Sequence, residues 1–283
     1  MDERMEKISF RNLVLQGLLG GAFLYCFFGV LQSLVSLWSN SDEYSHGFFI
    51  IPIAVYICWQ KRERLLQLPV RTSVVGLVVF IFSLLAYVGA KYAGVLTLVS
   101  LSMTLCLAGI VLYLLGWRLF RELSFPLFLH LFMIPVPGQF FSMATIPLQL
   151  LVSQISVMVT SWTGVPVFRE GNVIHLPQRT LEVVQACSGL RSLITLVTLS
   201  VIVAYFSLSS NLSRVMLVLA GIPVAVLVNI IRVSGMIYAF YYFQIDLTTD
   251  KVHTIYGLVI FMLALAILIG LKGVLSFWDK SKR

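Results

Sequence analysis

The sequence predicts an all-α integral membrane protein, a bundle of about eight transmembrane helices with a small β-hairpin at its outer mouth. Hydrophobic residues make up 59% of the 283 residues and charged residues only 11%. Soluble domains hold about 45–50% apolar and about 25% charged residues. Several apolar runs also approach the length of about 20 residues that crosses a bilayer core. These two observations exclude a soluble globular protein.

Eight apolar runs are expected to cross the membrane. They lie near Leu13–Leu37, Tyr44–Trp59, Ser73–Ala90, Gly94–Leu115, Leu123–Ile134, Ser188–Ser207, Leu212–Phe243 and Thr254–Leu275. The second and the fifth are short for a span. The first follows a segment with charges of both signs and lacks a small-residue cleavage site, so we expect a retained signal anchor. The whole chain, residues 1–283, is then one membrane domain.

A ninth apolar segment, Met143–Trp162, is interrupted by Pro147, two Gln and several Ser and Thr residues. We interpret it as an interfacial or re-entrant helix, and a true span is the alternative. A true span would invert every later segment and move the basic C-terminal tail to the outer side. The eight-span topology is therefore preferred.

The distribution of basic residues predicts the orientation. Cytoplasmic loops of membrane proteins are enriched in Lys and Arg. With both termini in the cytoplasm, 14 of the 20 Lys and Arg residues lie inside, in these clusters: Arg4/Lys7/Arg11, Lys61/Arg62/Arg64/Arg71, Arg118/Arg121, Arg214 and Lys272/Lys280/Lys282/Arg283. The net charge of +8 is explained by this rule and does not require a nucleic-acid partner. We expect a multi-pass membrane protein with both termini in the cytoplasm and its polar chemistry on the outer face.

One outer segment, residues 165–184, alternates apolar and polar residues on both sides of Glu170-Gly171-Asn172. Gly and Asn are the residues that tight hairpin turns favour. The pattern predicts a β-hairpin that caps the outer mouth of the helical bundle.

Cys187 differs from the other three cysteines, which lie inside long apolar runs. It is followed by Ser188-Gly189, where a helix is expected to begin, and a helix N-terminus favours a thiolate. Arg191 lies four residues later on the same helical face and also favours the thiolate. The alternative is that Cys187 is a small buried hydrophobic residue.

Arg232 lies inside the apolar run "VLVNIIRVSG". An arginine within a transmembrane helix is costly and marks a functional site by default. Asn229 lies three residues earlier on the same face and is expected to position it. The alternative is that the Arg232 side chain extends to the outer interface.

His253 begins the last span, and histidine is the usual general base near neutral pH. The alternative is a solvated histidine at a helix start. His46, in "DEYSHG", is a second candidate on the outer face. We find no metal-ligand spacing, no phosphate-binding glycine loop and no G-x-S-x-G elbow, so no metal or other cofactor is expected.

Cys187, Arg232 and His253 are expected at the outer ends of three consecutive spans. Acyl transfer needs such a set: a thiolate that attacks an amide carbonyl, a base that moves protons, and a cation that stabilises the oxyanion. The residues alone therefore predict a cysteine nucleophile at the outer membrane face.

The chain resembles the exosortase/archaeosortase family of membrane-embedded cysteine transpeptidases. The resemblance runs over most of the sequence, from "YSHGFFIIPIAVYICWQKR" through "FPLFLHLFMIPVPGQF" and "GVPVFREGNVIHLP" to "EVVQACSGLRSL", "IPVAVLVNIIRVSG" and "VHTIYG". The combination of "ACSGLRS", "NIIRV" and a lone His before a Gly-containing last helix is specific, whereas each part alone is weak. The appended C-terminal domain of some bacterial members is missing, so the subfamily is not assigned.

The resemblance implies a membrane cysteine protease and transpeptidase. The family's catalytic Cys, Arg and His correspond to Cys187, Arg232 and His253. The implied substrates are membrane-anchored exported proteins that end in a short motif such as Pro-Glu-Pro, a transmembrane helix and a basic tail. Transfer to an envelope or exopolysaccharide acceptor is implied too.

Supporting roles fall to Arg191, Glu182, Asn229 and His46. Two other functions compete: a transporter with an anion site at Arg232, which should show internal repeats, and a non-catalytic component of polysaccharide assembly. No convincing repeat is present, and a non-catalytic component would tolerate loss of the Cys187 thiol.

Overall fold

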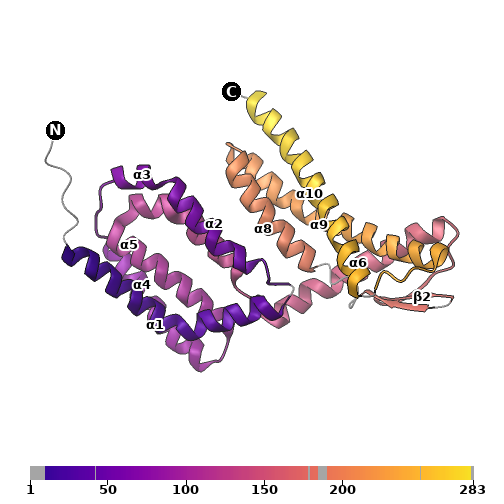
Figure 1. Cartoon of the computed structure of the whole chain (residues 1–283), viewed down its shortest axis with the longest axis horizontal. Helices are drawn as coiled ribbons and strands as arrows, with labels where there is room; N and C mark the ends of the chain where they lie inside the picture. The colour runs from indigo at the N-terminus through magenta and orange to yellow at the C-terminus, as the bar shows by residue number, and fades with distance from the viewer. Residues whose placement is uncertain (1–9, 42, 178, 184–189, 249, 282–283) are drawn as a thin grey trace. The chain divides into compact units, whose positions relative to one another are not determined.

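The computed structural model describes residues 10–41, 43–177, 179–183, 190–248 and 250–281, and most of them are helical (Figure 1). The chain divides into two compact units, Met1–Val136 and Pro137–Arg283. Each unit is considered by itself.

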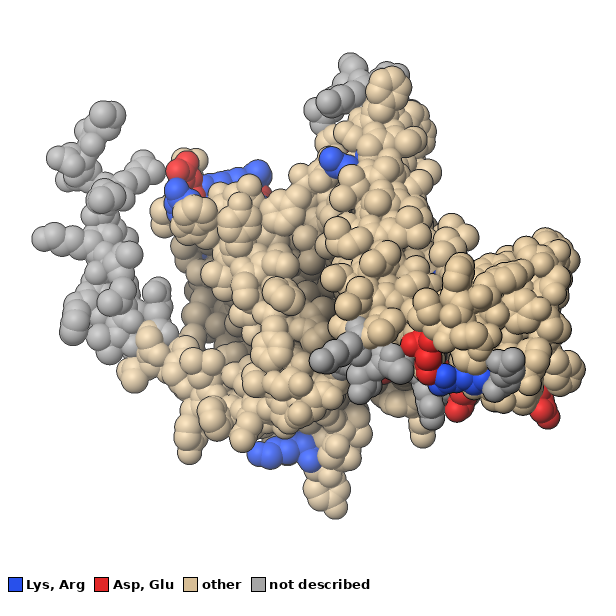
Figure 2. Space-filling model, turned by 45° about the vertical axis from the view of Figure 1, so that its right-hand side comes forward, with Lys and Arg blue, Asp and Glu red and all other residues tan. Residues whose placement is uncertain are grey.

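The helices have the length and composition of a multi-pass membrane protein. Within the described ranges, six are long and apolar enough to cross a bilayer: Gly17–Asn40, Val74–Tyr92, Leu96–Met133, Gly138–Trp162, Asn211–Phe243 and Val252–Asp279. Two shorter apolar helices are Gly47–Gln60 and Ser192–Ser207. The face seen in Figure 2 is mostly uncharged, with Lys, Arg, Asp and Glu confined to small patches. The count of eight spans remains a prediction.

The first unit consists of helices and one 3₁₀ turn. Its elements are α1 (Phe10–Asn40), α2 (Gly47–Gln60), α3 (Arg62–Gln67), α4 (Val74–Tyr92), α5 (Leu96–Leu129) and η1 (His130–Met133).

Helix α5 consists of two arms that reverse direction at Gly116. Gly116 has φ 80° and ψ 179°, a conformation that is essentially restricted to glycine. The hydroxyl of Thr97 donates to the Pro135 carbonyl over 2.7 Å, although 38 residues separate them. In a straight helix that spacing would be about 57 Å. The break falls between the runs that we predicted as separate spans, near 94–115 and 123–134.

Contacts at both ends align the second arm of α5 with α2. At one end, the Glu122 carboxylate pairs with Lys61 at 3.1 Å and with Arg64 at 2.7 Å. At the other end, His46 meets the Phe132 carbonyl at 3.0 Å. The two helices therefore run antiparallel, with polar contacts near both ends.

The second unit combines helices with a small sheet. Its elements are α6 (Gly138–Trp162), β1 (Phe168–Glu170), β2 (Val173–Leu176), β3 (Arg179–Glu182), α8 (Leu190–Ser207), α9 (Asn211–Phe243) and α10 (Asp250–Ser281).

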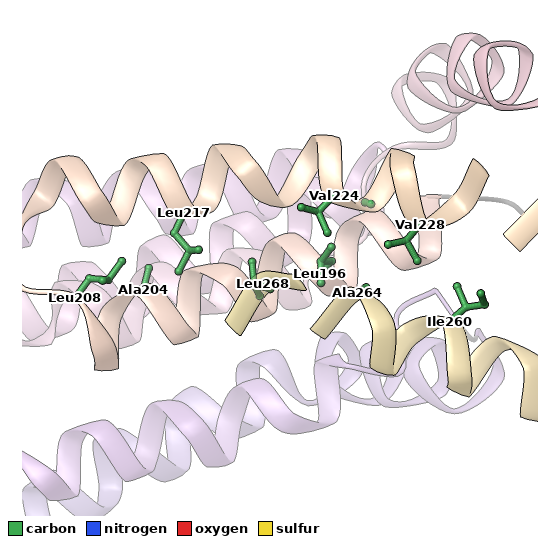
Figure 3. Packing of buried hydrophobic residues seen from close by; sticks show 10 residues of the cluster. Leu196, Ala204, Leu208, Leu217, Val224, Val228, Ile260, Ala264 and Leu268 are labelled. Carbon is green, nitrogen blue, oxygen red and sulfur yellow. The ribbon is translucent and has the colours of Figure 1, made fainter. Parts of the chain in front are cut away.

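Helices α8, α9 and α10 form a bundle around an apolar core. Figure 3 shows side chains of all three helices in this core, among them Leu196, Leu217 and Leu268, of which at most 1% is exposed. Burying side chains of this size stabilises the folded state by about 1.5–3 kcal/mol each in water. In a bilayer this drive is absent between helices, and close packing itself holds them together.

Polar contacts mark the two ends of this bundle. At one end, Asp279 of α10 accepts hydrogen bonds from the Ser213 hydroxyl at 2.5 Å and from the Ser210 amide at 3.2 Å. At the other end, Arg232 of α9 meets His253 of α10. The rise of a helix from residue 213 to residue 232 is about 28 Å, close to the thickness of about 30 Å of a hydrocarbon core.

The last third of α9, residues 233–243, continues for about 16 Å beyond Arg232 and packs against the sheet and α6. Val233, Met236 and Ile237 are buried there with Ile174 and Leu181 of the sheet. The sheet is antiparallel in the order β1-β2-β3. It therefore has one strand more than the predicted hairpin, and the first turn lies at Gly171, with φ 63°.

Helix α6 begins before the expected segment and is one continuous helix despite Pro147. The Ser156 hydroxyl donates to the Ile230 carbonyl of α9 at 3.4 Å, and the Thr163 and Tyr238 hydroxyls are 3.0 Å apart. Its length and composition suit a span. The interfacial or re-entrant placement therefore remains a prediction.

Candidate active site

Two of the three residues expected to carry the chemistry are in direct contact. Arg232 Nη2 lies 2.8 Å from His253 Nε2. A guanidinium can only donate hydrogen bonds, so Nε2 is the acceptor and the proton of the neutral imidazole is on Nδ1. In this contact the Nε2 lone pair of His253 is directed at the Arg232 guanidinium.

Tyr256 fixes the backbone from which Arg232 extends. It lies three residues after His253 on α10, and its hydroxyl donates to the Arg232 carbonyl at 2.9 Å. A Cβ atom at Gly235 would lie 2.2 Å from that hydroxyl, and one at Gly257 would lie 3.4 Å from Arg232 Nη2. The glycine at position 235 lets α9 and α10 approach closely at this level. We did not single out any of these three residues from the sequence.

Asn229 lies one helical turn before Arg232 and is only 3% exposed. Its amide oxygen and nitrogen, like Arg232 Nε, are buried and have no hydrogen-bond partner within the part of the chain that the structure describes. Buried amides normally make such bonds. Asn229 and Arg232 line the same small cavity, and no hydrogen bond joins their side chains.

A small cavity adjoins these polar groups. Its volume is about 10 Å³, and its lining residues are Ser192, Leu196, Ala225, Val228, Asn229, Arg232, Ile260, Phe261 and Ala264. A buried water needs about 10–15 Å³ and two to four polar partners. Ser192, Asn229 and Arg232 are polar groups of the kind that such a water would need.

Cys187 lies outside the described residues, and so does the side chain of Arg191. The chain is described on both sides of this segment. The Val183 amide donates to the Asn172 carbonyl at 3.0 Å, and α8 begins at Leu190, two residues before Ser192 of the cavity. The segment that carries Cys187 therefore joins the sheet to a helix that lines the same cavity as Arg232. Glu182, at the end of β3, is exposed.

His46 lies in the first unit and is only 8% exposed. Its Nε2 donates to the Phe132 carbonyl. This contact makes His46 a link between the start of α2 and η1.

Other sites are sparse in the described ranges. No three His, Cys, Asp or Glu side chains are close enough there to hold a metal ion. Of the other cysteines, Cys26 is exposed, Cys58 half-buried and Cys106 buried, each inside a helix. The chemistry of this part of the chain is thus concentrated where α8, α9 and α10 meet.

The chain matches a known protein family over most of its length. A family model described as transmembrane exosortase matches residues 38–270. No curated protein and no solved structure matches significantly.

The close approach at Gly235 gives a prediction on stability. We expect Gly235→Ala to lower the melting temperature of the purified protein in detergent, because the new methyl group collides with the Tyr256 hydroxyl. Overpacking of this kind costs about 1–3 kcal/mol. Adding Tyr256→Phe should restore part of the loss, since the next ring atom lies 3.4 Å away. Gly270→Ala, with open space around it, is the control, and equal melting of all variants would contradict this packing.

Proposed function

The chain belongs to the transmembrane exosortase family, and we propose that it is a cysteine protease and transpeptidase acting on C-terminal sorting signals of exported proteins. The observation that carries the proposal is the Arg232–His253 contact at one end of a helix bundle. A half-buried cation, an imidazole and a cysteine in the segment that leads into α8 are the groups that acyl transfer requires.

The reaction follows from the chemistry of these side chains. His253 takes the proton of the Cys187 thiol, and the thiolate attacks the carbonyl carbon of the scissile peptide bond. The resulting oxyanion is stabilised by the Arg232 guanidinium. When the carbon–nitrogen bond breaks, the protonated His253 gives its proton to the leaving amine. A thioester remains on Cys187 until an acceptor nucleophile attacks it, releases the product and restores the thiol.

The Arg232–His253 contact adds a condition to this scheme. While Nε2 accepts from the guanidinium, its lone pair is not available to a thiol proton. We infer that the substrate carbonyl draws the guanidinium towards itself, which frees Nε2 in the same movement. Substrate binding then creates both the oxyanion stabiliser and the base.

The proposed substrates are membrane-anchored proteins that carry a short motif of the Pro-Glu-Pro type, a transmembrane helix and a basic tail. The acceptor is an envelope or exopolysaccharide component. We propose an inner-membrane location, both termini in the cytoplasm and an active site at the periplasmic face. The length of the bundle supports a site near one membrane surface. About 28 Å of helix separates Arg232 from the Ser213–Asp279 contact at the other end, and a hydrocarbon core is about 30 Å thick. Asn229 is proposed to position Arg232, with Arg191, Glu182 and His46 in supporting roles.

Loss of the thiol should abolish the activity. We expect Cys187→Ala and Cys187→Ser to leave a co-expressed substrate uncut, because neither side chain supplies a thiolate. The measurement is the ratio of cut to uncut substrate on immunoblots at matched expression. Cys26→Ala is the control, since Cys26 lies exposed in α1. Normal processing by the Cys187→Ala variant would rule out the cysteine mechanism.

Substitutions of Arg232 test whether the site needs the directional hydrogen-bond donors of a guanidinium or only a positive charge. Arg offers a planar set of donors, whereas Lys is a point charge. We expect Arg232→Lys to reduce the cleavage rate by about 10²–10³-fold, the usual cost of losing an oxyanion donor, and Arg232→Ala at least as much. Both variants should still co-purify with the substrate. Near-normal cleavage by the lysine variant would show that charge alone suffices. Lost co-purification with unchanged cleavage of the bound substrate would make Arg232 a docking residue.

The orientation can be measured without any substrate. In a variant that lacks native cysteines, single cysteines are introduced at Glu170, Gln244 and Gln67, all of which are exposed. We expect a membrane-impermeant maleimide to label intact spheroplasts at positions 170 and 244 but not at 67. The reverse pattern would place the active site on the cytoplasmic side.

A further inference from the structure

A polar contact outside the Arg232–His253 pair joins the two chain segments that lead to the proposed catalytic residues. Arg179, the first residue of β3, donates from Nη1 to the Asp246 carboxylate and from Nη2 to the Thr248 hydroxyl at 3.0 Å. Its guanidinium carbon also lies 5.7 Å from the centre of the Phe240 ring. Asp246 in turn accepts a hydrogen bond from the Thr248 amide at 2.8 Å.

This contact joins two connections that lead to proposed catalytic residues. Arg179 begins the strand that ends at Glu182, two residues before Val184, where the segment that contains Cys187 begins. Asp246 and Thr248 belong to the connection between α9 and α10, and α10 carries His253 in its first turn. One arginine side chain therefore ties the connection that leads to the nucleophile to the connection that leads to the base.

The contact has the features of a fixed link. The side chains of Arg179 and Asp246 are 35% and 28% exposed, so both remain partly accessible to water. Desolvation raises the pKa of Asp246, but hydrogen bonds from Thr248 and Arg179 outweigh it and lower the pKa below its usual value. The carboxylate is therefore charged at neutral pH, and the link is lost only when the pH falls through this lowered pKa.

We propose that the Arg179–Asp246 pair is a positioning contact that sets the register between the Cys187 segment and His253. The proposal rests on the proposed function for the identity of the two reacting residues. Neither Arg179 nor Asp246 touches the reacting atoms. An ion pair with a merely structural role would contribute about 0–1 kcal/mol to stability at the surface, and its loss would not change the spacing between positions 187 and 253.

The experiment measures that spacing directly. In the full-length protein, Cys26, Cys58 and Cys106 are replaced by Ala, Cys187 is kept, and His253→Cys supplies its partner. The rate of disulfide formation with copper phenanthroline as oxidant is followed by mass spectrometry of the linked peptides. We expect Arg179→Gln and Asp246→Asn to slow the linkage by about tenfold or more, one decade corresponding to about 1.4 kcal/mol. The charge-exchanged pair Arg179→Asp with Asp246→Arg should recover much of the rate.

Arg169→Gln is the matched control. It removes an arginine of the same sheet that donates only to the Gly171 carbonyl in β1's own turn. In the enzyme with its native Cys187 and His253, Arg179→Gln should lower kcat with little change in KM, and the charge-exchanged pair should restore kcat.

Linkage at the parent rate in Arg179→Gln would overturn the proposal, and so would a parent protein that does not link at all. The proposal would also be overturned if the charge-exchanged pair recovered neither the rate of disulfide formation nor kcat. Failure of the proposed function is read separately, from normal processing by Cys187→Ala.

Discussion

The second unit is organised around one cation held in an apolar helix. At the centre of a bilayer an arginine costs several kcal/mol on insertion scales. Helix α9 instead places Arg232 near the end of the bundle, about 28 Å from the contact between Ser213 and Asp279. His253 accepts from its guanidinium, and Tyr256 donates to its backbone carbonyl. The approach of α10 to α9 at this level is therefore part of the site and not only of the fold.

Much of the helical architecture could be predicted from apolar runs, because a bilayer demands helices of known length. The reversal at Gly116 falls between two runs that we predicted as separate spans. The hairpin prediction counted one strand too few, although the alternation over residues 165–184 extends across Arg179–Glu182. Leu181 of this third strand is buried with residues of the last third of α9, a contact that the local pattern does not record.

The candidate site could be predicted only in part. Arg232 stands out because charge is rare in apolar helices, and His253 because it begins a span next to that level. Tyr256 and Gly235 gave no signal, since a tyrosine and a glycine are ordinary in transmembrane helices. Their role depends on the rotation and register of α9 against α10, which bring the Tyr256 hydroxyl within 2.2 Å of where a Cβ of residue 235 would lie.

How deep Arg232 lies in a membrane depends on the thickness of the bilayer as well as on the length of α9. The helix fixes the distance from Ser213 to Arg232, whereas the hydrocarbon thickness of membranes differs by several ångströms between lipid compositions. Short acyl chains would leave the guanidinium among headgroups and water. Long acyl chains would draw it into hydrocarbon and strengthen its attachment to His253. Acyl-chain length thereby acts on the same contact that holds the site together.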